Sequence, residues 1–324
     1  HDALPISGEL GNGTRSPTDT PVEVLGGSTW IDVDLNVYRT CGVRDDATLW
    51  CWGFGDLVGL GNGSTDNSNV PVQLDGVGWS SISAGHAYHT CVVRADGTLW
   101  CWGYNSNGEL GTGTSTDGSL SPVQALGSEW AQVRAGNEHT CGLEQDGTLW
   151  CWGRNFTGQL GTGNFDDSIV PVQVGAASEW RSLERVQQGG HAIRQDGTLW
   201  GWGLNGSGQL GDGTTETQSA PVQIGTADNW AQVDADGHGC GVRENGTLWC
   251  WGSNASGQLG DGSLTDRPYP EQVGSETTWR SVATGPQSTC AIQGDGSLWC
   301  WGSSPAGLGD GNFWIESPVE VELP

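Results

Sequence analysis

The sequence predicts an all-β fold of repeated four-stranded sheets, which are the blades of a β-propeller. Three observations predict it: a constant repeat of about 50 residues, a composition rich in Gly and Trp, and short strand-like segments without helical periodicity. The motif LWxWG occurs six times, and its second tryptophan stands at Trp52, Trp102, Trp152, Trp202, Trp251 and Trp301, at intervals of 50, 50, 50, 49 and 50 residues. A period this constant indicates that every repeat builds the same structural unit.

One repeat, residues 158–203, shows the predicted elements in order. A glycine-rich loop, GQLGTGNFDDSIV, is followed by PVQV as a first strand, EWRSLERV as a second and GGHAIRQ as a third. A DG turn then leads into TLWGWG, whose β-branched and aromatic residues favour a fourth strand. Four antiparallel strands in each repeat are what a propeller blade requires. Both faces of a blade pack on neighbouring blades, so alternate positions can all be apolar.

Composition and charge exclude several classes of partner. The chain of 324 residues has 38 acidic and 12 basic residues, and its formal net charge is -26. Nucleic acids and anionic membrane surfaces are bound through Lys and Arg, so we expect neither as a partner. No run of eighteen apolar residues is present, which excludes a membrane-spanning helix. We expect a monomer without a cofactor.

The repeat pattern GQLGxG…PVQV…W..V.AG..HTC.L..DGTLWCWG resembles the regulator of chromosome condensation repeats, from Gly8 to Pro324. The resemblance implies a β-propeller, typically with seven blades, and leaves function much more open than fold. The LGxG…PV.V half of the repeat occurs seven times and the W…LWxWG half six times. We therefore expect about six and a half blades, from a seven-bladed parent truncated at its N-terminus. A six-bladed ring with a spare strand is the alternative.

The first residues match no repeat. Residues 1–7, HDALPIS, back-translate to a DNA sequence beginning CACGACGCTCTTCCGATCT, which resembles a sequencing adaptor. We expect this segment to be foreign to the protein and exclude it from reasoning about the fold. Residues 8–324 are then expected to form a single propeller domain.

The ten cysteines form five pairs with a spacing of ten residues. They are Cys41 and Cys51, Cys91 and Cys101, Cys141 and Cys151, Cys240 and Cys250, and Cys290 and Cys300. A three-residue turn at 145–147 would place Cys141 opposite Cys151 at a non-hydrogen-bonded site, where Cα atoms lie about 4.5 Å apart. In the remaining repeat, the fourth in the chain, both positions change together, to His191 and Gly201, which favours covalent pairing. We predict five disulfides and hence an extracellular, cell-surface or periplasmic location, with free buried thiols as the alternative.

No catalytic set can be assembled from the histidines. His89 and His139 occupy the same position in HTC, whereas Arg39, Gly239 and Ser288 stand near the corresponding place in other repeats. HTC has no consistent acidic partner, so a nucleophile–His–Asp arrangement is not available and a scaffold role is favoured. The acidic loops, such as GDGTTET, match no EF-hand or RTX spacing. We predict no catalytic residue and no metal site, and calcium binding stays open.

Side chains that differ between repeats define a candidate binding rim. The first group is the apolar cluster Phe313, Trp314 and Ile315, which contains the one tryptophan outside the repeat pattern. The second group is Phe165 and Tyr269, which are aromatic residues in related loops. The third group is Phe54, Tyr104 and Arg154, which directly follow WG in their repeats. Exposed aromatic anchors on a constant scaffold are typical of binding sites. The alternative is that these residues cover blade edges.

The sequence thus predicts a non-enzymatic extracytoplasmic scaffold that presents variable rim loops to a protein or a glycan. One alternative is an inhibitor that occludes a secreted enzyme, as β-lactamase-inhibiting propellers of similar fold do. Another is guanine-nucleotide exchange on a small GTPase, the best-known activity of the family that the repeats resemble. That activity relies on inserted loops, whereas every interval here is 49 or 50 residues.

Overall fold

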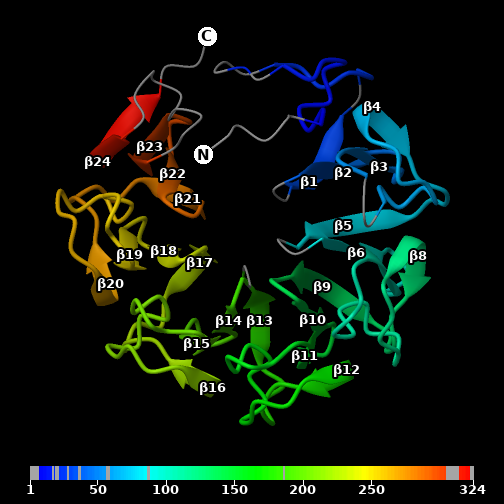
Figure 1. Ribbon diagram of the computed structural model, residues 1–324. Helices are drawn as coiled ribbons and strands as arrows, with labels where there is room; N and C mark the ends of the chain where they lie inside the picture. Colours follow the sequence, from blue (N-terminus) through cyan, green and yellow to red (C-terminus); the bar gives the residue numbers. More distant parts are fainter. Residues whose placement is uncertain are drawn as a thin grey trace. The chain divides into compact units, whose positions relative to one another are not determined.

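The structure is a computed structural model with two compact units. It describes residues 7–16, 18, 22–27, 29–35, 38–55, 59–85, 88–184, 187–303 and 314–321, so residues 1–6 of the predicted adaptor segment lie outside it. The first unit comprises His1–Phe156 and Asp166–Ser178, and the second comprises Thr157–Phe165 and Glu179–Pro324. Each unit contains three four-stranded antiparallel sheets, coloured blue to green and green to red in Figure 1. We call these sheets blades 1 to 6 in chain order.

Blades 1 to 3 form the first unit, and the strands of each blade pair in sequence order. Blade 1 contains β1 (Trp30–Leu35), β2 (Arg39–Arg44), β3 (Leu49–Gly53) and β4 (Ser68–Gln73). Blade 2 contains β5 (Trp79–Ala84), β6 (His89–Arg94), β7 (Leu99–Gly103) and β8 (Ser119–Gln124). Blade 3 contains β9 (Trp130–Ala135), β10 (His139–Glu144), β11 (Leu149–Gly153) and β12 (Ser168–Gln173).

Blades 4 to 6 form the second unit with the same strand order. Blade 4 contains β13 (Trp180–Leu183), β14 (Gly189–Arg194), β15 (Leu199–Gly203) and β16 (Gln218–Gln223). Blade 5 contains β17 (Trp230–Ala235), β18 (His238–Arg243), β19 (Leu248–Gly252) and β20 (Arg267–Gln272). Blade 6 contains β21 (Trp279–Thr284), β22 (Ser288–Gln293), β23 (Leu298–Ser303) and β24 (Trp314–Val321).

The PVQV strand belongs to the blade before it. In blade 3, Val172 of this segment lies opposite Cys151 of β11. The predicted order, with PVQV in the same sheet as the strand after it, is therefore wrong by one strand. The long loop after WG lets the chain turn back and pair antiparallel with the strand it has just left. A period of 50 residues is the same for either pairing, so periodicity could not distinguish them.

This shift also explains the unequal numbers of half-repeats. The last PV.V segment completes blade 6 as part of β24, which pairs with β23. Residues 22–24 of the first PV.V segment form no strand. The described residues thus contain six complete blades, and the predicted additional half-blade has no strand among them. The seven-bladed parent stays a prediction.

The central hairpin of each blade has the predicted register. Cys141 lies opposite Cys151, and Leu143 lies opposite Leu149. All five predicted cysteine pairs are disulfide-bonded with a Cα separation of 4.1 Å, and the described residues contain no free cysteine. Each bond therefore joins two directly opposed strands.

The second tryptophan of LWxWG connects its own blade to a loop of the preceding blade. The second tryptophan of LWxWG is buried in all six blades, with at most 2% of its surface exposed. In blade 3 the Trp152 Nε1 donates to the Glu109 carbonyl, 2.8 Å away in the loop between β7 and β8 of blade 2. The same loop continues along β12, where the Gly113 amide donates to the Ile169 carbonyl at 3.1 Å. Blades 2 and 3, blades 4 and 5, and blades 5 and 6 are thus joined by indole–carbonyl bonds as well as by apolar packing.

Candidate binding surface

Two variable positions of each repeat lie side by side. The residue after WG donates its backbone amide to the carbonyl of the residue before the second strand, as Phe54 does to Tyr38 at 2.8 Å. The same bond joins Tyr104 to Tyr88, Arg154 to Glu138, Leu204 to Gln188 and Ser303 to Gln287, at 2.7–3.2 Å. The fixed bond holds positions whose side chains change from blade to blade. The side chains can therefore vary there without altering the scaffold.

Blades 1 and 2 use these positions to build an aromatic cluster, which we define as Tyr38, Phe54 and Tyr88. The Tyr38 and Tyr88 rings stack with centroids 5.6 Å apart and an interplanar angle of 5°. The Phe54 ring lies 5.7 Å from that of Tyr38. All three side chains are half-buried, and Tyr104, bonded through its backbone to Tyr88, is 38% exposed. The cluster is thus a partly exposed aromatic surface of the kind that forms binding anchors.

The backbone of Tyr88 is in an unusual conformation. Its φ angle is +73°, in the left-handed region that glycine adopts most easily. Glu138 in blade 3 and Gly237 in blade 5 hold the same position, with φ angles of +61° and +77°. A side chain there costs about 1–2 kcal/mol relative to an unstrained backbone. Partial burial and a hydrogen bond with Tyr38 raise the pKa of Tyr88, so its hydroxyl stays protonated at neutral pH.

Blade 3 has a charged pair at the same two positions. Arg154 forms an ion pair with Glu138, and both side chains are about one-third exposed. The guanidinium carbon of Arg154 also lies 4.2 Å from the ring centroid of Phe156. The predicted rim residue Arg154 is therefore held by neighbours within its own blade.

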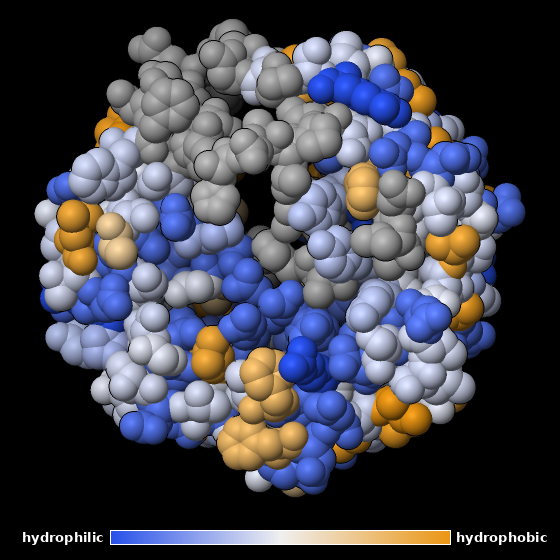
Figure 2. All heavy atoms as spheres, in the orientation of Figure 1, coloured by the Kyte–Doolittle hydropathy of each residue, from blue (hydrophilic) through white to orange (hydrophobic). Residues whose placement is uncertain are grey.

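The remaining rim candidates lie on separate blades. Trp314 begins β24, is 54% exposed, and donates from Nε1 to the Ser256 carbonyl at 2.9 Å. Ile315 packs against the core of blade 6, which agrees with the alternative that it covers a blade edge. Tyr269 on β20 and Phe165 in the loop before β12 are 51% and 54% exposed. Figure 2 likewise shows small separate hydrophobic patches on a mostly hydrophilic face. Phe313 lies outside the described residues.

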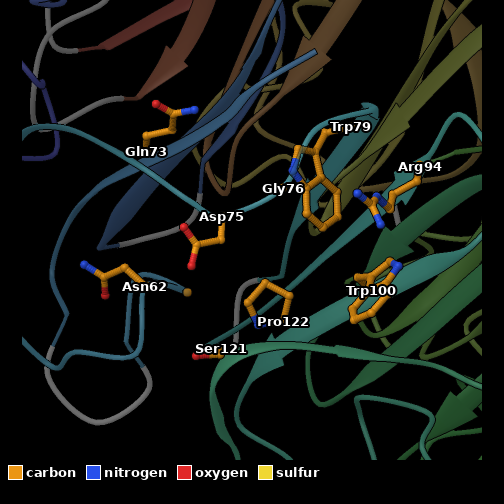
Figure 3. A pocket seen from close by; sticks show the side chains of 10 residues that line it. Asn62, Gln73, Asp75, Gly76, Trp79, Arg94, Trp100, Ser121 and Pro122 are labelled. Carbon is orange, nitrogen blue, oxygen red and sulfur yellow. The ribbon is translucent and has the colours of Figure 1, made fainter.

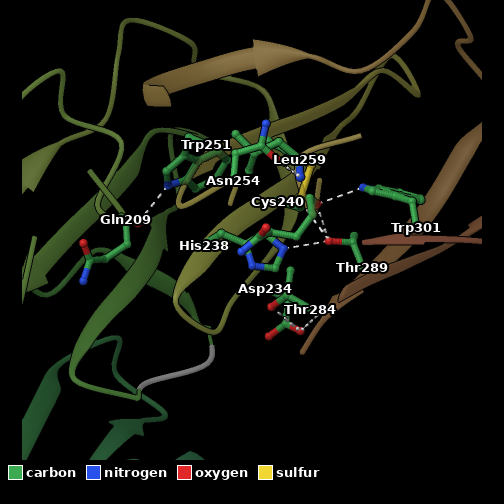
Figure 4. The surroundings of a disulfide bond; sticks show 12 residues. Gln209, Asp234, His238, Cys240, Trp251, Asn254, Leu259, Thr284, Thr289 and Trp301 are labelled. Atoms are coloured by element: carbon green, nitrogen blue, oxygen red, sulfur yellow. Dashed lines mark hydrogen bonds between the residues drawn. A yellow bond between two sulfur atoms is a disulfide. The ribbon is translucent and has the colours of Figure 1, made fainter. Parts of the chain in front are cut away.

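The histidine of HTC links consecutive blades. His238, rather than Gly239 as predicted, occupies this position in blade 5, because His238 faces Gly252 as His89 faces Gly103. The His238 Nε2 lies 2.6 Å from Thr289 Oγ1 in blade 6. Figure 4 marks this hydrogen bond with a dashed line. Blades 2 and 3 have the same contact between His89 and Thr140, at 2.9 Å.

The hydrogen-bond roles at this link follow from its third member. Thr289 Oγ1 donates its proton to the Gln258 carbonyl at 2.8 Å, so His238 Nε2 must be the donor to Thr289. Burial lowers the pKa of His238 to about 4, which keeps the ring neutral at physiological pH. A neutral buried ring with a fixed donor role is a structural element that joins two blades.

Blade 4 departs from this pattern. His191 takes the place of the first cysteine opposite Gly201, and burial lowers its pKa to about 4. Gly190 stands where blades 1, 2, 3 and 6 have the threonine of HTC, and a cavity of about 110 Å³ lies beside His191 and Trp202. The cavity follows from the small side chains at these positions.

Within the described ranges, no group of three or more His, Cys, Asp or Glu residues is placed to hold a metal ion. No helix in this part of the chain is long and apolar enough to cross a membrane.

Disulfide-stapled four-stranded blades in a 50-residue repeat define a repeat β-propeller protein. Five segments match the Regulator of chromosome condensation (RCC1) repeat, at residues 46–93, 96–143, 146–188, 196–240 and 245–292. These segments cover well over half of the sequence, and the chain belongs to the RCC1 repeat family. A second RCC1 repeat profile matches residues 79–109 and 130–159.

Several solved structures share this fold. Human WBSCR16 superposes with a TM-score of 0.83 at 21% identity, covering 94% of this chain and 85% of its own. Yeast RCC1 (Prp20), solved with bound Kap60, has a TM-score of 0.75 at 19% identity, covering 90% of this chain and 75% of its own. Prp20p from Saccharomyces cerevisiae, whose structure was described with its binding properties to Gsp1p and histones, has a TM-score of 0.73 at 19% identity and coverages of 90% and 76%. At these identities the likeness shows the fold alone. No curated protein sequence matches the chain.

Proposed function

We propose that the protein is a non-enzymatic binding scaffold that captures a protein or a glycan through the aromatic cluster of blades 1 and 2. The observation that carries this proposal is the stacking of Tyr38 on Tyr88, with Phe54 beside them, at positions that vary between blades. Aromatic side chains that are rigid and partly exposed contribute most of the energy in many interfaces. Tyrosine also offers a hydroxyl to a polar partner while its ring packs against apolar surface.

The strained backbone of Tyr88 supports the same conclusion. Glycine occupies the equivalent position in blade 5, at Gly237, so the fold itself does not require a side chain there. A bulky residue at a φ angle of +73° is maintained against an energetic cost. Retention of tyrosine at this place favours a role in recognition over a role in packing.

An extracytoplasmic location is part of the proposal. Five disulfides in one chain support an oxidising compartment, because thiols are kept reduced in the cytosol. A net charge of -26 suits such a location, since repulsion between molecules keeps an acidic protein soluble. The yeast relative solved with Kap60 supports a protein as one class of partner for this fold.

Replacing Tyr88 by glycine separates binding from stability. Tyr88→Gly removes the stacked ring and relieves the backbone strain, so we expect the variant to unfold at the same or a higher temperature. Capture of glycans from an array, or of proteins from an extracellular extract, should fall at least tenfold, as loss of a hot-spot aromatic does. Glu138→Gly makes the same backbone change in blade 3 and should leave capture unchanged. Unchanged capture by Tyr88→Gly, with loss in Glu138→Gly, would reject the aromatic cluster as the binding surface.

A further inference from the structure

Four blades hold an arginine between two tryptophans. The arginine ends the second strand, one tryptophan begins the blade, and the other is the first of LWxWG. In blade 4 the guanidinium carbon of Arg194 lies 3.9 Å from the Trp200 ring centroid and 4.9 Å from that of Trp180. The corresponding distances are 3.9 and 4.7 Å for Arg44 in blade 1, and 3.8 and 4.7 Å for Arg243 in blade 5. We call this space between two indoles the arginine slot.

Blade 6 has the slot but not the arginine. Gln293 lies opposite Trp279, as Arg194 lies opposite Trp180 in blade 4. The Trp279 and Trp299 rings are 6.2 Å apart at 81°. The two indoles of blade 4 are 6.4 Å apart at 90°. The frame that holds a guanidinium in blade 4 is therefore present in blade 6 with a shorter, uncharged side chain at the arginine position.

An open groove lies at the slot of blade 6. Its volume is about 640 Å³, and its lining includes Trp279, Trp299 and Gln293. Trp279 is almost fully buried, whereas Trp299 and Gln293 are half-buried. A groove of this size admits the side chain of a partner as well as the adjoining backbone.

Blade 2 shows the same groove with an arginine at its edge. The groove of blade 2 has a volume of about 430 Å³. Trp79, Arg94 and Trp100 lie on one side of it (Figure 3). Arg94 donates to the Val77 carbonyl, and its guanidinium carbon is 5.8 Å from the Trp100 centroid. In this blade the guanidinium is farther from its LWxWG tryptophan, Trp100, than in the other blades, but its carbon is still 4.7 Å from the Trp79 ring centroid. The slot is thus a place that guanidinium groups occupy repeatedly in this chain.

Two carboxylates line the groove of blade 6. Glu276 is exposed and accepts a hydrogen bond from the Ser275 amide through Oε2 at 3.0 Å. Asp261 is paired with Arg267 at 3.1 Å, so Glu276 is the carboxylate better placed to accept bonds from an incoming cation. Carboxylate oxygens bind a guanidinium through two parallel hydrogen bonds, and indole faces attract it electrostatically.

We propose that the groove of blade 6 binds an arginine side chain of a partner protein, with its guanidinium in the slot between Trp279 and Trp299. The Glu276 carboxylate accepts hydrogen bonds from the bound group. Lysine is a poorer occupant, because its ammonium is compact and strongly hydrated while the slot stacks a planar group. This site lies in the second unit, involves none of the aromatic cluster, and stands independently of the function proposed above.

The test uses a substitution that places an arginine of the chain itself in the slot of blade 6. Gln293→Arg introduces the residue that four sibling blades carry, so the variant should fold and place its own guanidinium between the two indoles. Gln293→Ala is the matched control and leaves the slot open. The probe is Nα-acetyl-L-argininamide, added to the full chain with its disulfides intact, and binding is followed by the indole N–H signals in NMR spectra. We expect at least tenfold weaker binding to Gln293→Arg than to the parent chain, and retained binding to Gln293→Ala.

Two analogues of the probe test the chemistry. The citrulline amide has the same shape without the charge and should bind at least tenfold more weakly, since both the indoles and Glu276 recognise the charge. The lysine amide should also bind more weakly than the arginine amide. Equal binding of the citrulline amide, equal binding of the lysine amide, or undiminished binding to Gln293→Arg would each overturn the proposal.

Discussion

Acid should destabilise this protein through its buried histidines before its carboxylates titrate. His191 and His238 are buried, and burial lowers the pKa of each to about 4. The unfolded chain has ordinary histidines with a pKa near 6.5, so between about pH 6.5 and 4 it binds more protons than the folded protein. Stability from these groups is therefore fully present above pH 6.5 and is lost as the pH falls towards 4.

The size of the effect follows from the shift in pKa. A difference of about 2.5 pKa units at 1.36 kcal/mol each gives a loss on the order of 3 kcal/mol for each histidine. At His238 the loss has a clear structural cause, because a charged ring would be buried beside the Thr289 hydroxyl. Hydrogen bonds from Thr148 lower the pKa of Asp146, so its contribution is lost only at more acidic pH.

The assay is urea unfolding followed by tryptophan fluorescence at pH 7, 5.5 and 4, with disulfides intact. The comparison variant is His238→Gln, whose side-chain amide can still donate to Thr289 but does not titrate. We expect the variant to lose about 3 kcal/mol less than the parent chain between pH 7 and 4. Burial raises the pKa of Glu109, but this residue is the same in both proteins and cancels in the difference. Identical pH dependence of the two proteins would refute the reasoning.

Two further predictions concern the hairpins and the glycine after LWxW. His191→Cys combined with Gly201→Cys should form a sixth disulfide at the register of the other five and stabilise the chain by at most about 3 kcal/mol, a gain that reductant must abolish in thermal melts. Gly103→Ala should cost about 3 kcal/mol or more, because its φ angle is +102° and a new Cβ would lie 2.2 Å from the Tyr88 carbonyl oxygen. Gly206→Ala, where a Cβ meets open space, should change the free energy of unfolding by less than about 1 kcal/mol, and a similar cost at both glycines in urea unfolding would contradict this account.

The spacing of residues within one repeat was enough to predict the central hairpins. It was not enough to predict which residues of neighbouring repeats contact one another. The register of Cys141 against Cys151 follows from one turn and ten residues of sequence. The position of His238 was misassigned because a step of 50 residues reaches Gly239, whereas the interval before Trp251 is 49 residues. A count from the neighbouring cysteine would have located it.

The aromatic cluster shows what sequence reasoning missed at the candidate site. Phe54 was singled out, but Tyr38 and Tyr88 were not, although each stands directly before the second strand in YRTC and YHTC. Their recurrence in two consecutive repeats was a usable signal. That the two rings stack depends on how blade 1 sits against blade 2, which strand periodicity within one repeat does not determine. The arginine slots were missed for a similar reason, because they join residues from the first, second and third strands of a blade.

The origin of the last strand of each blade determines where this chain can be divided. A fragment that starts at PVQV would carry a strand whose partner has been removed, and it would lack the outer strand of its final sheet. Both edges would then expose unpaired backbone groups, which favour association between molecules. Fragments that begin at an inner-strand tryptophan such as Trp130 and end after the next PVQV keep their sheets whole. Shortened versions of the protein should therefore begin at the tryptophan that starts a blade rather than at the PVQV segment before it.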